Sequence, residues 1–279
     1  MQCAPSARNE KIMSYQRIAC LSTEAVETLY LLCAEESIAG ISGFTTRPAR
    51  ARKEKPKVSG FTTAKLERIL AVEPDLVIAF SDLQAEIVRE LIRAGVEVHV
   101  FNQRDLAGIF RMIPALAALV GRQAAGDRLV AELQELLDGA RLRARSLPRH
   151  PRIYFEEWHD PLISNIRWVS ELIEAAGGED CFAEESRRRA ARERIIADPA
   201  EVVRRAPDII IGSWCGKKFS PEQVRARAGW EAVPAVANDQ LHEIKSADIL
   251  SPGPAAITEG LAQLERIVAQ WAQHAAARA

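Results

Sequence analysis

The sequence lacks the features that would tie it to a membrane or to nucleic acid. No apolar run approaches the ~20 residues that a membrane-spanning helix needs. Residues 1–22 contain no apolar stretch of signal-peptide length before the first expected strand. The net charge is -1, from 37 basic and 38 acidic residues, which gives no general electrostatic reason to expect nucleic acid as a partner. Taken literally, these absences predict a soluble cytoplasmic protein.

Cysteines with metal-site spacing and the familiar catalytic motifs are also missing. The 5 cysteines show no zinc-ligand spacing, and we expect Cys20 and Cys33 to be buried free thiols in apolar surroundings. Nothing in this pattern demands an oxidising compartment. The chain has no phosphate-binding loop, no Gly-x-Gly-x-x-Gly and no nucleophile elbow. We therefore expect no enzyme activity and no required cofactor.

What the sequence does contain is one phrase that occurs twice. Residues 63–81 read TAKLERILAVEPDLVIAFS, and residues 196–214 read IADPAEVVRRAPDIIIGSW. Each copy has a helix-period segment, then Pro-Asp, then an aliphatic run. That run is too short for a helix and too apolar for a half-exposed strand, so it suits a parallel sheet covered on both faces. The repeat predicts two similar α/β lobes with a ligand cleft between them.

Strands and helices alternate on either side of a helical middle segment, which favours parallel sheets. We divide the chain into an N-terminal α/β lobe (17–104), a helical linker (105–147) and a C-terminal α/β lobe (148–279). Within the linker, one helix over 123–145 would extend for ~35 Å and join the lobes. The expected strands are 17–21, 38–42, 76–80, 96–101, 152–156, 208–212 and 241–244, and further helices are expected from about 63, over 83–94 and over 258–274.

Three stretches carry a family resemblance: VSGFTTAKLERILAVEPDLVIAF (58–80), RIYFEEWHDPLISNIRWVSELIEAAGGEDCF (152–182) and IIADPAEVVRRAPDIIIGS (195–213). With the intervening helix, they resemble the substrate-binding proteins of ABC importers for vitamin B12, haem and iron-siderophores, above all the vitamin B12 binders. The resemblance implies a non-catalytic, monomeric, periplasmic protein. Its ligand would be a small metal complex, first a corrinoid such as cobalamin and alternatively haem or an iron-siderophore. Its partner would be an ABC permease dimer.

The resemblance places ligand contacts on loops at the carboxyl ends of strands, where open parallel sheets bind ligands. Positions that touch the corrin ring in vitamin B12 binders align with Phe44, Phe61 and Phe80, and aromatic walls suit a broad apolar face. Trp158 and Trp214 occupy the corresponding loops of the second lobe. Core positions are the alternative for all of these aromatics. The remaining candidate ligand contacts are Cys215, Lys217 and Asp248.

The resemblance also implies docking residues. In this family one surface glutamate on each lobe pairs with arginines of the membrane permease. Glu67 matches the first of these positions, and Glu201 falls at or one residue beside the second. The alternative for an exposed helical glutamate is simple solubility.

His159 is the candidate metal ligand. Together with Cys215 and with Glu156 or Glu157 it could ligate a transition metal, or it could coordinate a cobalt or iron centre axially. Asp160 and His242 also fall near strand ends, and His-Asp-Pro is as readily a turn. The candidate metal site and the missing signal peptide support a second hypothesis, in which the chain is a cytoplasmic relative that holds or processes a metal complex.

Overall fold

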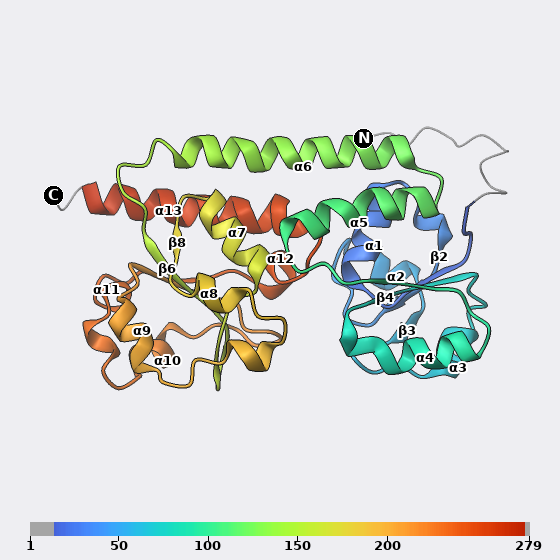
Figure 1. The fold of residues 1–279 in the computed structure, drawn as a ribbon, viewed down its shortest axis with the longest axis horizontal. Coiled ribbons are helices and arrows are strands. Elements are labelled where there is room, and N and C mark those ends of the chain that lie inside the picture. The colour runs from blue at the N-terminus through green and yellow to red at the C-terminus, as the bar shows by residue number, and fades with distance from the viewer. Residues whose placement is uncertain (1–13, 277–279) are drawn as a thin grey trace. The chain divides into compact units, whose positions relative to one another are not determined.

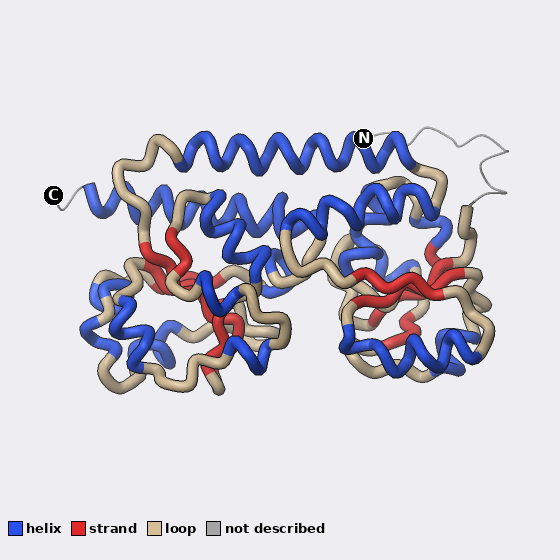
Figure 2. Tube along the Cα trace, viewed as in Figure 1, coloured by secondary structure: helices blue, strands red, loops and turns tan. Residues whose placement is uncertain are grey.

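The computed structural model describes residues 14–276, and the chain divides into two compact units, residues 1–132 and 133–279. Each unit holds one five-stranded sheet with helices packed around it (Figures 1 and 2). The division falls within α6 (Gln123–Ala144), a continuous helix of 22 residues. The mixed α/β architecture with sheet lobes and a long helix is therefore confirmed, while the ligand cleft stays a prediction. No helix among residues 14–276 is both long and apolar enough to cross a membrane.

The sheet of the first unit is entirely parallel, in the order β3-β2-β1-β4-β5. Its central strands are buried, because helices α1 and α5 cover one face and α3 and α4 the other (Figure 1). The strands are β1 (Ile18–Cys20), β2 (Ile38–Ser42), β3 (Lys57–Ser59), β4 (Leu76–Phe80) and β5 (Val98–Phe101). The α-helices are α1 (Thr23–Leu31), α2 (Ala51–Glu54), α3 (Leu66–Leu70), α4 (Ala85–Arg93) and α5 (Leu106–Leu119), with short 3-10 turns η2 (Glu35–Ser37) and η3 (Asp82–Gln84).

The sheet of the second unit has the order β10-β9-β6-β7, and β8 also pairs with β6. All these pairings are parallel except that of β6 with β7, an antiparallel hairpin. The hairpin turns at Asp160-Pro161, as the His-Asp-Pro motif allows, and it extends β6 to His159, beyond the expected end at Glu156. The strands are β6 (Arg152–His159), β7 (Leu162–Ser164), β8 (Glu179–Asp180), β9 (Ile209–Gly212) and β10 (Leu241–Glu243).

Helices surround this second sheet, and α13 lies alongside the end of α6, where Arg143 donates to Glu265 at 2.8 Å (Figure 1). A π-helical turn, η6 (Ala256–Gly260), leads into α13, so that the regular helix begins later than expected. The helical elements are α7 (Arg167–Ala175), α8 (Ala183–Ser186), η4 (Ala191–Arg194), α9 (Ala200–Arg205), α10 (Pro221–Arg225), η5 (Trp230–Ala232), α11 (Pro234–Ala237), α12 (Ser246–Ile249) and α13 (Leu261–Ala276).

The repeated Pro-Asp phrase has the same structural role in both units. The Asp75 carboxylate accepts a hydrogen bond from the main-chain N–H of Arg17 (3.0 Å), and the Asp208 carboxylate accepts one from that of Arg152 (2.9 Å). In return, the N–H of each aspartate donates to the carbonyl of the same arginine. Each aspartate thus fastens the start of its own strand to the start of a neighbouring central strand, and the repeat in sequence is a repeat in sheet construction.

Two local expectations are wrong. The helix predicted from about Thr63 begins at Leu66, because the N–H of Gly60 donates to the carbonyl of Thr63 at 2.7 Å and closes a turn there. Cys33 is only half-buried and is part of a disulfide. Its apolar neighbours belong to the end of α1, and Cys33 itself lies just beyond that helix with a positive φ of 54°. Cys20 is a buried free thiol, as expected.

Candidate functional site

Three of the predicted ligand-binding residues form one aromatic cluster in the first unit. Phe44 follows β2, Phe61 follows β3 and Phe80 ends β4, so all three rings lie at the carboxyl edge of the parallel sheet. The ring centroids of Phe44 and Phe61 are 5.9 Å apart, and those of Phe61 and Phe80 are 5.1 Å apart. We call this cluster the aromatic triad. Phe44 is 60% exposed and Phe61 is 46% exposed, and exposed apolar clusters of this kind mark interaction sites.

A second cluster lies at the carboxyl edge of the other sheet, around His159. Its imidazole stacks on the indole of Trp214, with ring centroids 4.4 Å apart, and meets the ring of Trp158 edge-on at 4.8 Å. The Nζ of Lys217 lies within hydrogen-bonding distance of the His159 Nε2 and 5.3 Å from the centre of the Trp214 ring. We call these four residues the His159 cluster.

The surroundings of His159 favour its neutral form. Burial and then the nearby Lys217 ammonium lower the pKa of His159 from its usual value of 6.5. An ammonium group can only donate, so the His159 Nε2 accepts in this contact, while Nδ1 is buried without a partner in the described part of the chain. The cluster therefore places one cation against an imidazole whose neutral form is favoured.

Trp214 lies in the core of the second unit, although the residues that follow it in sequence are polar. Its side chain is only 3% exposed and packs in the core, with its ring 5.1 Å from that of Phe219. The indole Nε1 donates a 2.9 Å hydrogen bond to the Glu156 carboxylate, which draws the ring inward. The Trp214 ring therefore packs in the core with His159 stacked against it, which is the core position given above as the alternative for this aromatic. Trp158 is half-buried, and its Nε1 donates to the carbonyl of Asp160.

The two glutamates that might have joined His159 at a metal are already paired. Glu156 is fully buried and accepts two hydrogen bonds from Arg227, at 2.6 and 2.8 Å. Glu157 accepts from the buried Arg194 at 2.7 Å. Across residues 14–276 there is no group of three or more His, Cys, Asp and Glu side chains that could hold a metal ion. The idea of a site built from His159 and these glutamates is therefore wrong.

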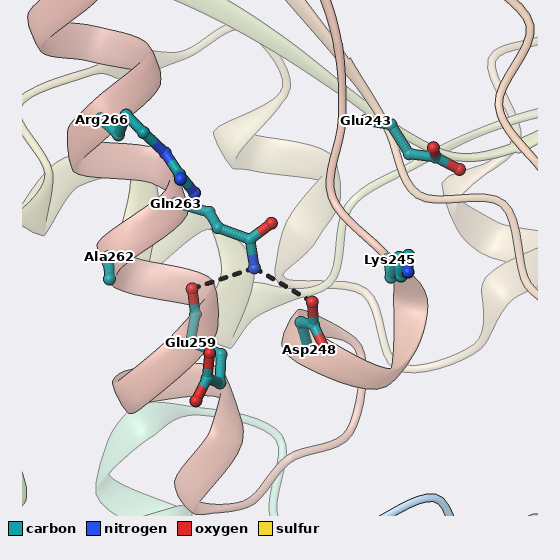
Figure 3. A pocket seen from close by; sticks show the side chains of 7 residues that line it. All are labelled: Glu243, Lys245, Asp248, Glu259, Ala262, Gln263 and Arg266. Carbon is teal, nitrogen blue, oxygen red and sulfur yellow. Dashed lines mark hydrogen bonds between the residues drawn. The ribbon is translucent and has the colours of Figure 1, made fainter.

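The other candidates of the second unit lie on different elements of the chain. Cys215 is exposed in the loop after β9, and the half-buried His242 lies on β10. Asp248 lies on α12 in a polar pocket of about 570 Å³ (Figure 3). There the Nε2 of Gln263 donates to the Asp248 carboxylate and to the Glu259 carbonyl, both at 3.1 Å. The pocket is lined by Glu243, Lys245, Asp248, Glu259, Ala262, Gln263 and Arg266.

The two candidate docking glutamates differ in their surroundings. Glu67 is exposed in the first turn of α3, and no ion pair of it is found within the described part of the chain. Glu201, in the first turn of α9, accepts hydrogen bonds from Arg205 and Arg204 of its own helix, both at 2.8 Å. These two arginines, Arg205 most strongly, lower the pKa of Glu201. Neither carboxylate is buried, but only Glu67 is open to a new partner.

With this geometry established, comparison with known proteins identifies the family. The profile described as periplasmic binding protein matches residues 18–247. The chain belongs to the periplasmic binding protein family. It is similar to the vitamin B12-binding protein of Vibrio campbellii, with 26% identity over 242 residues, 85% of this chain and 84% of the relative.

Solved structures of this family show the same fold. The chain is similar to the periplasmic vitamin B12 binding protein BtuF of Vibrio cholerae, with a TM-score of 0.73, 22% identity, and 93% of this chain and 98% of that chain covered. It is also similar to the periplasmic heme-binding protein RhuT from Roseiflexus sp. RS-1, with a TM-score of 0.76, 22% identity, and 91% and 99% covered. The fold is therefore shared by binders of different metal complexes.

Sequence reasoning did not find the two arginines that form ion pairs with Glu156 and Glu157 in the second unit of this binding protein. A signal was present, because two adjacent glutamates in a strand that is otherwise buried need cationic partners. The arginine-rich stretch 187–194 supplies one of them, Arg194. The other, Arg227, lies 71 residues from Glu156, in a stretch without any pattern of its own.

Proposed function

We propose that this chain is the non-catalytic binding protein of an ABC importer and that it binds a corrinoid such as cobalamin through the aromatic triad. The single observation that carries the proposal is the exposed face of Phe44 and Phe61 beside Phe80, at the carboxyl edge of a parallel sheet. The names of the vitamin B12-binding relatives support the choice of ligand.

The triad suits such a ligand on physical grounds. The two exposed rings are T-shaped to one another, so they present both a face and an edge to a broad, mostly apolar surface. Each aromatic contact of this kind contributes ~1 kcal/mol beyond the area it buries. Polar groups at the periphery of the ligand would then select its orientation.

A second candidate ligand is haem or another carboxylate-bearing chelate, and the His159 cluster favours it. The exposed Lys217 ammonium suits a carboxylate, whereas the neutral amide side chains of a corrinoid have less need of a cation. The neutral imidazole of His159 could also coordinate iron axially, once Lys217 releases its Nε2. The support for this candidate lies entirely in the second unit.

The compartment and the partner are part of the proposal. The disulfide at Cys33 supports a periplasmic location, because disulfides persist in oxidising compartments. Glu67 and Glu201 are the proposed contacts to permease arginines. The exposure of Glu67 supports that role, whereas Glu201 is half-buried and already paired with Arg204 and Arg205. We propose that the chain binds its ligand and contacts the permease as a monomer.

Titration of the purified protein with cyanocobalamin, haemin and a ferric catecholate, followed by absorbance and calorimetry, tests the proposal. We expect saturable, stoichiometric binding of cyanocobalamin. Binding of haemin alone, with a Soret band that changes in a His159→Ala variant, would replace the corrinoid with the second candidate. Failure to bind any of the three would contradict the proposed function.

A further inference from the structure

We propose that Gln84 is a positioning residue that sets the geometry of the aromatic triad. The inference rests on the proposed function, because it explains how the proposed ligand surface is held ready. It concerns a side chain that does not touch the ligand and that acts through Phe61 and Phe80. Nothing in the pattern of the sequence pointed to it.

The side-chain amide of Gln84 joins three separate segments of the first unit. Its Nε2 donates to the carbonyl of Phe61 at 2.9 Å and to the carbonyl of Leu21, just beyond β1, at 3.3 Å. Its Oε1 accepts from the N–H of Phe80 at 3.1 Å. Both amide hydrogens and one oxygen lone pair are therefore in use, and all three partners are main-chain groups. The main chains of two triad residues are tied to each other through this one amide.

Burial makes the loss of any of these hydrogen bonds costly. Gln84 is only 3% exposed, so water does not readily replace a lost partner, and an unpaired buried polar group is costly. The short turn η3 places the amide there. Ser81 caps that turn through its hydroxyl, which accepts from the N–H of Leu83, and its φ of 47° and ψ of 179° lie in a region that residues other than glycine rarely adopt. A strained backbone conformation persists only where the surrounding structure enforces it. The strain at Ser81, three residues before Gln84, therefore indicates that the surrounding structure fixes the position of the Gln84 amide.

Ser42 completes the arrangement on the other side of Phe61. Its buried hydroxyl donates to the carbonyl of Gly60 at 3.0 Å and accepts from the N–H of Phe44 at 3.3 Å. Ser42 therefore links the Phe44 loop to the Phe61 loop, as Gln84 links the Phe61 loop to the end of β4. Two buried polar side chains thus connect two loops and the end of β4, and Gln84 makes three hydrogen bonds where Ser42 makes two.

The consequence for binding is preorganisation. Without the amide, the Phe61 loop and the end of β4 would have to be ordered by the ligand itself. Ordering two aromatic side chains and their loops on binding weakens affinity by about tenfold, from the usual cost of immobilising interface side chains. The loss should appear in Kd even though Gln84 makes no ligand contact.

The test compares Gln84→Met, which keeps size but makes no hydrogen bond to these groups, with Gln84→Glu. The latter keeps an acceptor for the N–H of Phe80 but has at most one hydrogen to donate, so it cannot satisfy the carbonyls of both Phe61 and Leu21. The matched control is Thr28→Val, which removes another buried hydrogen bond of the first unit, from the Thr28 hydroxyl to the carbonyl of Glu24 at 2.7 Å. Each variant is measured for cyanocobalamin Kd, for melting temperature and by 19F NMR after incorporation of 4-fluorophenylalanine.

We expect both Gln84 variants to weaken cyanocobalamin binding about tenfold and to shift the fluorine resonances of Phe61 and Phe80. Thr28→Val should lower the melting temperature and leave Kd unchanged. In a Phe61→Ala background, Gln84→Met should have a much smaller effect on Kd, since the ring that it positions is gone. Wild-type Kd and unshifted resonances in both Gln84 variants would overturn the inference.

The readouts also separate this inference from the proposed function. If the wild-type protein binds no cyanocobalamin, the proposed function fails, but the fluorine spectra still report whether Gln84 sets the triad. If the wild type binds and the Gln84 variants bind equally well, the positioning role alone is wrong. Should Gln84→Met fail to fold, the Gln84→Glu variant carries the same comparison.

Discussion

Removing the positive partner of Glu156 should destabilise the second unit strongly. In an Arg227→Met variant, Glu156 would lose both of its hydrogen bonds to the guanidinium and keep only the one from the Trp214 Nε1. The carboxylate is fully buried, and Arg227 is 17% exposed. The charge would therefore remain in the interior without a counter-charge.

The expected magnitude follows from the burial of the pair. Removing one partner of a buried ion pair costs about 3–5 kcal/mol, because the other charge is left desolvated. For a unit of this size each kcal/mol lowers Tm by about 2–4 °C, so the transition of the second unit should fall by roughly 6–20 °C. Loosening of Trp214 should also disturb His159, which stacks on it.

Differential scanning calorimetry of three variants measures this effect. The double variant Glu156→Gln/Arg227→Met removes both charges and keeps an acceptor for Trp214, so it should recover much of the loss. Arg204→Met, which breaks only exposed pairs with Glu201 and Asp198, should leave Tm nearly unchanged. An Arg227→Met protein that melts with the wild type would refute the reasoning, as would a double variant less stable than the single one.

Two further predictions concern pH and docking. The pKa of His159 is lowered from 6.5, so below that pH the unfolded chain binds the proton more readily than the folded one; the second unit should therefore lose stability as the pH falls toward about 5. His159→Gln should reduce this loss in melting curves, and an unchanged slope would contradict it. Reversing both Glu67 and Glu201 to arginine should lower uptake into cells at least about tenfold, through like-charge repulsion, with Kd intact. Because Glu201 is already paired on its own helix, Glu67→Arg alone should account for most of the effect, and undiminished uptake would remove the importer role.

The features that the sequence predicts well are those encoded locally. The Pro-Asp repeat indicates the two sheets because each copy carries both a strand and the aspartate that fastens it to its neighbour. The long helix is visible in uninterrupted helical spacing over residues 123–144. The aromatic triad is also predictable in place, since each phenylalanine follows or ends a recognisable strand.

What the sequence does not show are contacts between distant segments. Trp214 has polar neighbours in sequence, but its orientation is decided by Glu156, 58 residues away. Gln84 bonds to Leu21, which lies 63 residues away, and to Phe61, 23 residues away. Whether a polar residue is a ligand contact or a support depends on such partners, and no periodicity reports them.

The most direct test of the central claim is the cyanocobalamin affinity of a Phe44→Ala/Phe61→Ala variant, measured by isothermal titration calorimetry beside Ile92→Ala. Ile92 is 61% exposed on α4 and lines a separate apolar hollow of the same unit, so it controls for the loss of any exposed apolar side chain. Losing two aromatic contacts should cost roughly 1–3 kcal/mol, or about 5- to 150-fold in Kd. We expect this loss in the double variant, with wild-type Kd in Ile92→Ala and little change in Tm for either. Wild-type affinity in the double variant, or an equal loss in Ile92→Ala, would contradict the assignment of the aromatic triad as the ligand surface.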